Sequence, residues 1–395
     1  MKKIAIASSG LGHVARGVES WARDTADALH EQGLDVTLFS GVRIDPGPAR
    51  RVVVPCLRRS SSVSRLLVRL FPGFSWRWGL KDGYGLEQLT FWLNLRRLLD
   101  GFDILHVQDP MLALWCRKAR LAERVATKEV LAHGTEEPAA FLGQFDYVQH
   151  LIPWHLEKVL KELGLNAVLA GWCVAPNFVD TVRFAPVESE ARKREIRRQL
   201  GLPEDVFLVG SVGAVKATHK RMDYLIREFA SFSSTFDFRL STFDVSSPHL
   251  VIAGARDSET EGVVRDARDL LGERVTFLLD YPFVKMPDFY KALDVFVLPS
   301  LFEMMGIVFV EAMASGVPVL AHRHPVLEYV VGEGGCCIDM EGVGVLAEAM
   351  RKVENRKSNV EITSLKAREH VEKNFAKHVV IGKYIEYYER ILDDA

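Results

Sequence analysis

The stretch PSLFEMMGIVFVEAMASGVPV, residues 299–319, carries the strongest signal for both fold and function. It follows the apolar run Val295–Leu298, which predicts a buried strand, and it continues into a helix that starts near Gly306. Glu303 lies in the loop and Glu311 lies on the helix. Both carboxylates can therefore face the carboxyl edge of a parallel sheet, where such sheets bind their ligands.

The start of this helix, around Met305, Gly306 and Ile307, offers a second chemical feature. The first N–H groups of a helix have no intrahelical partner and can bind an anion. A carboxylate such as that of Glu311 can accept hydrogen bonds from two hydroxyls, which suits the diol of a sugar. The plain alternative is that Glu303 caps the helix and Glu311 is a solvated surface residue. That alternative explains each part but explains the whole string poorly.

Outward from this stretch, short apolar runs alternate with amphipathic ones. The expected strands are 3–8, 36–39, 104–107, 130–132, 207–212, 250–253, 275–278, 295–298 and 317–321. The expected helices include 18–32, 222–231, 263–271, 286–292, 308–315, 364–374 and 378–392. This alternation indicates an α/β protein with parallel sheets covered on both faces. A proline-containing segment at 175–186 suits a linker, so two Rossmann-like domains facing a cleft are expected.

Composition excludes several classes of protein. The 395 residues carry a formal net charge of −2, which argues against a uniformly basic nucleic-acid binder. The five cysteines have no C-x-x-C spacing, so reduced thiols in a cytoplasmic protein are expected. The longest uncharged stretch, Leu163–Val179, contains two asparagines and a proline. It is shorter than the roughly 20 apolar residues that a membrane span needs, so no span is expected.

The string at 299–319 resembles the E-x7-E signature of retaining glycosyltransferases with the GT-B fold, in particular glycosyltransferase family 4. The usual form is P-S-x-x-E-x-x-G-x-x-x-x-E-A-M-A-x-G-x-P-V, and this sequence matches it closely. The resemblance implies that Glu311 binds the ribose of a nucleotide-sugar donor and that Glu303 lies beside the transferred sugar. The donor-binding helix start would include Met305, Gly306 and Ile307.

The resemblance also implies a domain organisation. It predicts an N-terminal Rossmann-like, acceptor-side domain and a C-terminal Rossmann-like donor domain around a central cleft. The last helix would cross back to the first domain. The expected boundaries are 1–174 for the first domain, 175–186 for the linker, 187–375 for the donor domain and 376–395 for the returning helix.

Two further segments of the second half resemble the same family. Residues 174–180, VAPNFVD, resemble its V-x-P-N-G-V-D linker, with Phe178 in place of glycine. Residues 209–226 resemble its phosphate loop, in which Lys220 matches the lysine that contacts the donor diphosphate. The arginine usual after the glycine is replaced by Ala214, and Lys216 is a candidate to supply the missing charge.

The first half holds the remaining candidates. The loop SGLGHVARGVE, residues 9–19, joins the first strand to the first helix and contains Gly10, Gly12 and His13 as acceptor-side candidates. Gly17 opens the helix and resembles part of the family's G-G-x-E, with Arg16 in place of the first glycine. His133 follows a strand and resembles the histidine by which the family's first domain reaches the donor sugar. Asp109, and more weakly His106, are expected at the same sheet edge.

The resemblance implies transfer of a hexosyl unit from a UDP- or GDP-sugar to a hydroxyl acceptor, with retention at the anomeric carbon. Lys220, helped by Lys216 or Arg221, would stabilise the leaving diphosphate. No D-x-D occurs in the chain, so neither a metal nor another cofactor is expected. Two alternatives stay open. One is a nucleotide-sugar 2-epimerase of the same fold, and the other is a catalytically silent protein that binds nucleotide sugars.

Residues 50–81 form a basic segment with eight Arg or Lys residues and no acidic one, interleaved with apolar and aromatic residues. A short helix with an apolar face is expected at 62–71, with Arg65 and Arg69 beside that face. We expect either a peripheral enzyme that docks on an anionic membrane surface from the cytoplasm or a soluble enzyme. The first would act on a lipid-linked or cell-envelope glycan. The second would pair these arginines with acidic residues elsewhere.

Overall fold

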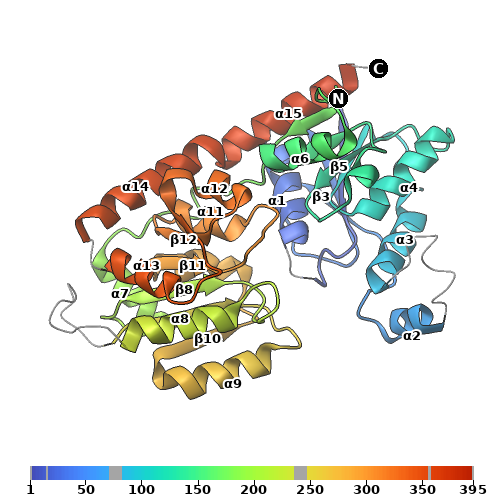
Figure 1. Ribbon diagram of the computed structural model, residues 1–395. Coiled ribbons are helices and arrows are strands. Elements are labelled where there is room, and N and C mark those ends of the chain that lie inside the picture. Colours follow the sequence, from blue (N-terminus) through green and yellow to red (C-terminus); the bar gives the residue numbers. More distant parts are fainter. Residues whose placement is uncertain (1, 15–16, 71–81, 235–246, 355–356, 394–395) are drawn as a thin grey trace. The chain divides into compact units, whose positions relative to one another are not determined.

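The chain folds into two compact units (Figure 1). The computed structural model describes residues 2–14, 17–70, 82–234, 247–354 and 357–393. Unit 1 comprises Met1–Asn177 together with Val380–Ala395, and unit 2 comprises Phe178–Val379. The C-terminal segment is therefore part of unit 1, as the sequence predicts.

Unit 1 is built on a parallel sheet. Among the described residues it has seven strands in the order β3-β2-β1-β4-β5-β6-β7. Their bounds are β1 (Lys3–Ser8), β2 (Asp35–Ser40), β3 (Arg50–Val53), β4 (Ile104–Val107), β5 (Lys128–His133), β6 (Val148–His150) and β7 (Trp172–Val174). The helices are α1 (Gly17–Glu31), α2 (Ser62–Leu70), α3 (Gly83–Leu95), α4 (Pro110–Leu121), α5 (Ala139–Leu142), α6 (Pro153–Leu163) and most of α15 (Lys377–Asp393).

Unit 2 repeats this plan. Its parallel sheet has the order β10-β9-β8-β11-β12-β13 among the described residues. The strands are β8 (Leu208–Val212), β9 (His249–Gly254), β10 (Val275–Leu279), β11 (Val295–Leu298), β12 (Val319–His322) and β13 (Gly335–Ile338). The α-helices are α7 (Glu190–Gln199), α8 (Met222–Ser234), α9 (Thr260–Leu271), α10 (Met286–Lys291), α11 (Ile307–Ala314), α12 (Pro325–Val331), α13 (Val345–Glu354) and α14 (Lys357–Asn374), joined by short 3-10 turns at Gly272–Arg274, Phe283–Lys285 and Gly332–Gly334.

Helices cover both faces of the unit 2 sheet. In Figure 1, α8 and α9 lie on one face and α11 and α12 on the other, with β8 and β11 between them. The central strand β11 is buried along its whole length, as its unbroken apolar sequence predicts. The sequence therefore identified the α/β class correctly, and both units have the Rossmann strand order.

The strands that the sequence did not reveal are the short ones near the sheet edges: β3, β6, β7 and β13. Two arginines open β3, and β6 has a glutamine and a histidine among its three residues. Each of the four strands has only three or four residues, which is too short for a recognisable strand pattern. Pairing with a neighbouring strand in the sheet specifies them instead.

The last helix, α15, completes the core of unit 1. The hydroxyl of Tyr384 accepts hydrogen bonds from Trp21 Nε1 at 3.2 Å and Gln149 Nε2 at 2.8 Å. The hydroxyl of Tyr388 lies 2.6 Å from Nδ1 of His106, which is fully buried in β4. Burial lowers the pKa of His106 to about 3. His106 is thus held inside the unit and is not a residue of the sheet edge.

None of the helices in the described ranges combines the length and the apolar character that crossing a lipid bilayer requires.

Candidate functional site

The candidate residues of unit 2 gather where its strand order reverses. In both sheets this reversal lies between two central neighbours, β1 and β4 in unit 1, and β8 and β11 in unit 2. The loops that leave the carboxyl ends of two such strands diverge to opposite faces, which opens a place for a ligand. Lys220 lies in the loop after β8, and Glu303 lies in the loop after β11.

An ion pair joins these two loops. Nζ of Lys220 lies 2.5 Å from Oε1 of Glu303, and the two side chains are only 18% and 12% exposed. Residues with positive φ flank Lys220 on both sides, His219 at 66° and Arg221 at 52°. Left-handed backbone costs free energy for residues other than glycine, so the tertiary structure must hold this turn in place.

The β8 loop also depends on a close backbone approach at Gly254, the last residue of β9. Gly254 has a φ of +159°, and a Cβ on it would lie 1.7 Å from the carbonyl oxygen of Gly213. The N–H of Gly213 in turn donates to the carbonyl of Ala253. A side chain at 254 would therefore push away the loop that carries Lys220.

Glu311 lies on α11 and is buried. Its Oε2 accepts a hydrogen bond of 2.8 Å from the hydroxyl of Tyr290 on α10. Burial, followed by the charge of Glu311, raises the pKa of Tyr290 well above its usual value, so the tyrosine stays a donor. Tyr290 holds the Glu311 carboxylate in one orientation, and the sequence contained no motif that identifies this tyrosine.

The start of α11 at Gly306 has no side-chain cap. Gly306 is left-handed at φ 72°, and a Cβ there would meet the Phe309 ring at 2.8 Å. Met305 is buried beside it, and Ile307 is half-buried as the first helical residue. The Ser300 hydroxyl, in the loop after β11, is also buried, and no described residue forms a hydrogen bond with it.

Lys216 and Arg221 have partners other than Glu303. Nζ of Lys216 lies 3.6 Å from Asp257, and Arg221 donates to the carbonyl of Met340 at 2.7 Å. Glu259, which the sequence did not indicate, receives hydrogen bonds from both backbone N–H groups of Ala217 and Thr218 and from the Thr218 hydroxyl. Of the three cations that the sequence proposed here, Lys220 is the one paired with Glu303.

In unit 1 a buried carboxylate organises the first loop. Asp109 accepts hydrogen bonds from the backbone N–H of Ser9 at 2.6 Å and from the Tyr84 hydroxyl at 2.5 Å. Burial raises the pKa of Asp109, although both hydrogen bonds oppose this effect. Asp109 thus ties the end of β1 to α3 at the sheet edge where the sequence placed it.

A second buried carboxylate, Glu87 of α3, holds His13. Oε2 of Glu87 lies 2.8 Å from His13 Nε2, while Arg59 reaches Oε1 at 2.6 Å. Burial raises the pKa of Glu87, but the hydrogen bonds from Arg59 and His13 outweigh it, so the pKa is lowered. Nδ1 of His13 is buried, and no described residue forms a hydrogen bond with it. Glu87 was missed because it belongs to no motif, although a glutamate in an otherwise uncharged helix was a usable signal.

The glycines of this loop differ in what they require. A Cβ on Gly10 would lie 2.4 Å from Oε1 of Glu19 and 2.8 Å from Nη2 of Arg59, and one on Gly12 would lie 2.4 Å from Val42. Gly10 and Gly12 therefore allow close packing. Gly17 opens α1 in an exposed position with space around it. Arg16 lies outside the described residues.

His133 ends β5 within a cluster of three buried histidines. Its Nδ1 lies 3.1 Å from Nδ1 of His150, and its ring centroid lies 5.2 Å from that of His155. Burial, together with the charges of His150, His155 and Lys158, lowers the pKa of His133 to about 2. Its imidazole is neutral near pH 7 and can donate one hydrogen bond and accept another. The sequence identified His133 and missed its two partners.

The basic segment 50–81 is partly neutralised within unit 1. Arg51 lies 2.7 Å from Asp27, and Arg59 lies 2.6 Å from Glu87. These two arginines therefore pair with acidic residues outside the basic segment, as the alternative to membrane docking predicted. The predicted helix exists as α2. Residues 71–81, with Trp76 and Trp78, lie outside the described residues.

No group of three or more His, Cys, Asp or Glu side chains is placed to hold a metal ion in the part of the chain that the structure describes.

Two family models match consecutive parts of the chain. "Glycosyltransferase Family 4" matches residues 15–183, and "Glycosyl transferases group 1" matches residues 192–378. Together the two models cover most of both Rossmann-like units. The chain belongs to glycosyltransferase family 4, the group 1 glycosyltransferases.

The curated relatives that match part of the chain include glycosyltransferases, and solved structures share its fold. The D-inositol 3-phosphate glycosyltransferase of Acidothermus cellulolyticus is 36% identical over 173 residues, which are 42% of this chain and 36% of that relative. The chain thus spans about a third of the length of this curated relative. Sucrose-phosphate synthase from Thermosynechococcus elongatus has a TM-score of 0.78 at 19% identity over the full length of both chains. Anabaena HepE in complex with UDP and glucose has a TM-score of 0.73 at 14% identity, covering 98% of this chain and all of that one.

The buried histidines predict a stability loss in acid. The pKa of His150 is lowered from 6.5 to about 3, first by burial and then by the charge of His155. As pH falls below 6.5, the unfolded state binds this proton before the folded state does. The stability is therefore complete above pH 6.5 and is lost as pH falls toward 3. Near pH 5 the loss from His150 is about 2 kcal/mol.

Urea unfolding at pH 7.5 and pH 5 measures this loss. The His150→Gln variant should lose about 2 kcal/mol less than wild type between the two pH values. Val148→Ala, which weakens the same strand without removing a titratable group, should lower stability equally at both. Equal pH sensitivity of wild type and His150→Gln would contradict the prediction.

Proposed function

We propose that the protein transfers a hexosyl unit from a nucleotide sugar to a hydroxyl acceptor, with retention at the anomeric carbon. The observation that carries this proposal is the Lys220–Glu303 ion pair at the reversal point of the unit 2 sheet. Its two partners are a cation for a diphosphate and a carboxylate for a sugar, beside a helix end that can bind an anion. Glu311 lies further along the same helix.

Each group has a chemical task in this proposal. Nζ of Lys220 has three N–H donors, so it can hold Glu303 and a diphosphate oxygen together. The start of α11, at Gly306 and Ile307, adds N–H groups toward the same negative charge. The Glu311 carboxylate, oriented by Tyr290, can accept the ribose hydroxyls.

Catalysis then consists of positioning and charge stabilisation. The bond between the anomeric carbon and the diphosphate oxygen breaks while the acceptor oxygen bonds to that carbon on the same face. The leaving phosphate oxygen takes the acceptor's proton, so no enzyme nucleophile is needed. Stabilising charge on the departing diphosphate is the largest contribution that the protein makes in such a step.

The comparisons support a nucleotide sugar as the ligand of this protein. The Anabaena protein of the same fold is described in complex with UDP and glucose, and in another structure with UDP-glucose. We propose a UDP- or GDP-hexose as donor. We further propose that Lys220 and the α11 N-terminus neutralise the diphosphate without a metal ion. Neither the epimerase nor the silent binding protein is favoured by the family to which the chain belongs.

We assign the acceptor side to unit 1. Gly10 and Gly12 let the first loop pack closely. Asp109 and Glu87 hold the loop through hydrogen bonds with Ser9 and His13. Nδ1 of His13 is fixed by the contact of Nε2 with Glu87 and can accept a hydrogen bond from an acceptor hydroxyl. The neutral His133 can donate a hydrogen bond to a sugar hydroxyl.

We also propose that α2 docks the enzyme on an anionic membrane surface, where a lipid-linked or cell-envelope glycan would be the acceptor. The side chains of Val63 and Leu66 on α2 are 53% and 55% exposed, and Arg65 and Arg69 of the same helix are exposed. Basic and apolar residues exposed on one helix are typical of peripheral membrane helices.

The two glutamates should separate nucleotide binding from turnover. Glu311→Gln should weaken UDP or GDP binding about tenfold or more, because a charged hydrogen-bond acceptor is lost. Glu303→Gln should leave nucleotide affinity unchanged and lower kcat. Isothermal titration with the free nucleotide measures the first effect, and release of UDP from UDP-glucose measures the second. Glu328→Gln on the exposed side of α12 is the control, and wild-type affinity of Glu311→Gln would refute its assignment.

Charge on the leaving group gives a second prediction. Lys220→Met should lower kcat roughly 10²–10³-fold, the usual cost of losing one group that stabilises transition-state charge. Lys216→Met, which loses only its pair with Asp257, should change kcat far less. EDTA should leave wild-type activity intact. If chelation abolishes activity and Mg²⁺ or Mn²⁺ restores it, the metal-independent mechanism is wrong.

Co-sedimentation with anionic vesicles tests the membrane proposal. Each arginine contributes about 1 kcal/mol near an anionic surface, so Arg65→Ser with Arg69→Ser should lower vesicle affinity about thirtyfold. Arg194→Ser with Arg198→Ser makes the same charge change on α7 and should have little effect. Wild-type binding should weaken with salt. Absence of sedimentation at low salt would reject membrane docking and leave the transferase proposal standing.

A further inference from the structure

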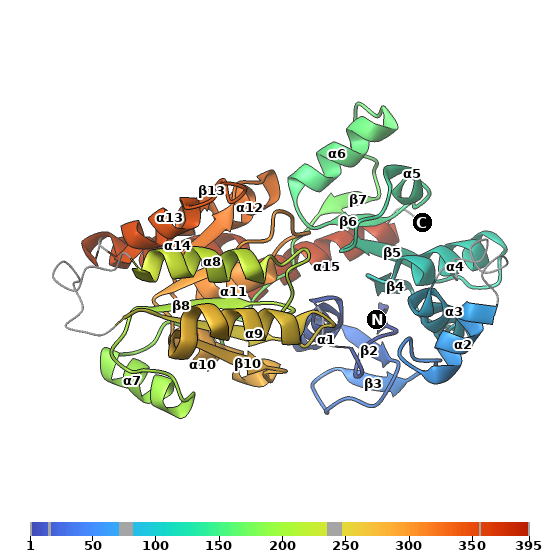
Figure 2. The same ribbon diagram turned by 60° about the horizontal axis from the view of Figure 1, so that its bottom comes forward.

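A cavity of about 550 Å³ lies between α3 and α4 in unit 1, and we call it the α3–α4 pocket. Figure 2 shows α2, α3 and α4 grouped together in this unit. Its size is within the ~300–1,000 Å³ typical of small-molecule sites. The residues that line it are Trp92, Arg96, Arg97, Trp115, Lys118, Ala119, Arg124 and Val125.

Four of these side chains are cations, and none is acidic. Within the described ranges, no ion pair or side-chain hydrogen bond involves Arg96, Arg97, Lys118 or Arg124. The neighbouring Arg120 is different, because it pairs with Glu129 at 2.9 Å and with Asp146 at 2.6 Å. The chain thus neutralises the arginine beside the pocket and leaves the positive charge of the pocket itself uncompensated by described residues.

Helix dipoles explain only part of this charge. Lys118 lies in the last turn of α4, and Arg96 caps the end of α3, where cations are favoured. The helix dipoles can account for Arg96 at the end of α3 and for Lys118 at the end of α4. They do not account for Arg124, which lies in a loop and lines the same pocket.

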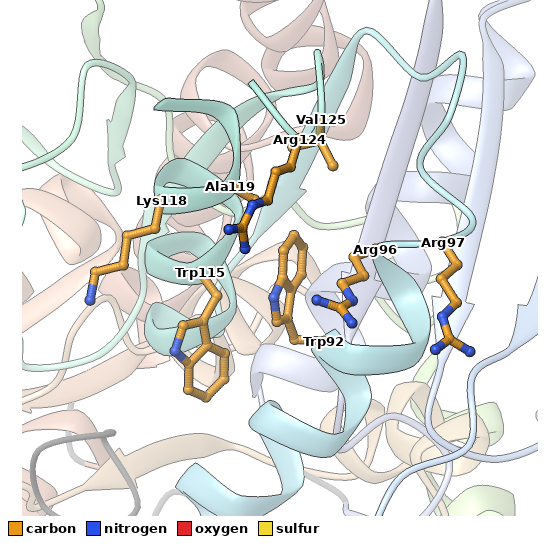
Figure 3. A pocket seen from close by; sticks show the side chains of 8 residues that line it. All are labelled: Trp92, Arg96, Arg97, Trp115, Lys118, Ala119, Arg124 and Val125. Carbon is orange, nitrogen blue, oxygen red and sulfur yellow. The ribbon is translucent and has the colours of Figure 1, made fainter. Parts of the chain in front are cut away.

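The tryptophans give the pocket an apolar surface beside its charges. Trp92 is buried and Trp115 is half-buried, one from each helix. In Figure 3 the side chains of Arg96 and Arg124 extend toward Trp92 from opposite sides, and Trp115 lies on the α4 side of the pocket. Indole faces bind rings and apolar groups, whereas guanidinium groups bind phosphate through paired hydrogen bonds.

The α3–α4 pocket is remote from the candidate acceptor residues of unit 1. Helices α3 and α4 end at Leu95 and Leu121, and the chain then enters β4 and β5 at their amino ends. Asp109 and His133 lie at the carboxyl ends of those same two strands. The pocket therefore lies at the edge of the sheet formed by the amino ends of the strands, opposite the carboxyl ends that hold Asp109 and His133. The proposed transfer reaction makes no use of it.

We propose that the α3–α4 pocket binds a second ligand that carries a phosphate group, with Arg96 and Arg124 on the phosphate and Trp92 and Trp115 against its organic part. A soluble phosphorylated compound and a phospholipid headgroup share this chemistry. This site is independent of the donor site in unit 2.

Phenyl phosphate and inorganic phosphate serve as soluble probes in isothermal titration, with UDP present at saturation to occupy the donor site. Wild type should bind phenyl phosphate more tightly than inorganic phosphate. Arg96→Gln with Arg124→Gln should weaken both about tenfold or more, because charge-assisted hydrogen bonds are lost. Trp115→Leu should weaken phenyl phosphate alone. The control, Arg50→Gln with Lys161→Gln, removes two exposed charges elsewhere on unit 1 and should change neither affinity.

Vesicles of phosphatidylglycerol distinguish the two sources of the phosphate. If the ligand is a lipid headgroup, the Arg96 and Arg124 double variant, in which α2 is intact, should also bind these vesicles more weakly than wild type. If the ligand is soluble, vesicle binding should persist while phenyl phosphate binding falls. The double variant should keep wild-type UDP affinity and UDP release, so failure here is distinguishable from failure of the transferase proposal. Absence of saturable phosphate binding by wild type, with vesicle binding indifferent to the double variant, would overturn the proposal.

Discussion

The parallel alignment of β8 and β11 is the constraint on which the candidate donor site depends. Because these two strands are neighbours that run in the same direction, their carboxyl ends deliver two separate loops to one place. Lys220 comes from one loop and Glu303 from the other, and their ion pair joins segments 83 residues apart. The turn around Lys220 is held by close packing of Gly254 against Gly213. Because Gly254 ends β9, this neighbouring strand also helps to position the lysine.

Unit 1 depends on a different constraint, which is the burial of two carboxylates beside its first loop. Glu87 and Asp109 are inaccessible to water, and burial alone would drive both toward the neutral form. Arg59, His13, Tyr84 and the N–H of Ser9 supply the hydrogen bonds that make burial tolerable. The first loop is thereby fixed from the core side, and its outward groups are preorganised for a ligand.

The two edges of the unit 1 sheet carry different chemistry. The carboxyl edge holds the buried carboxylate of Asp109 and the neighbouring buried histidines His133 and His150. The opposite edge holds the α3–α4 pocket, in which arginines and tryptophans face a common space.

The returning C-terminal helix was expected from the resemblance to glycosyltransferase family 4. The sequence by itself determined the α/β class, the position of Glu303, Lys220, Asp109 and His133 at or after strand ends, and the position of Glu311 on the helix that follows β11. These follow from apolar periodicity and from a long motif, both of which are local. The sequence could not determine that Lys220 pairs with Glu303 while Lys216 pairs with Asp257, because both lysines lie in one loop and only the packed backbone separates them. It likewise missed Tyr290, Glu87, His150 and the four cations of the α3–α4 pocket. Those residues belong to no motif, and they meet their partners only where distant segments pack together, which only the tertiary structure decides.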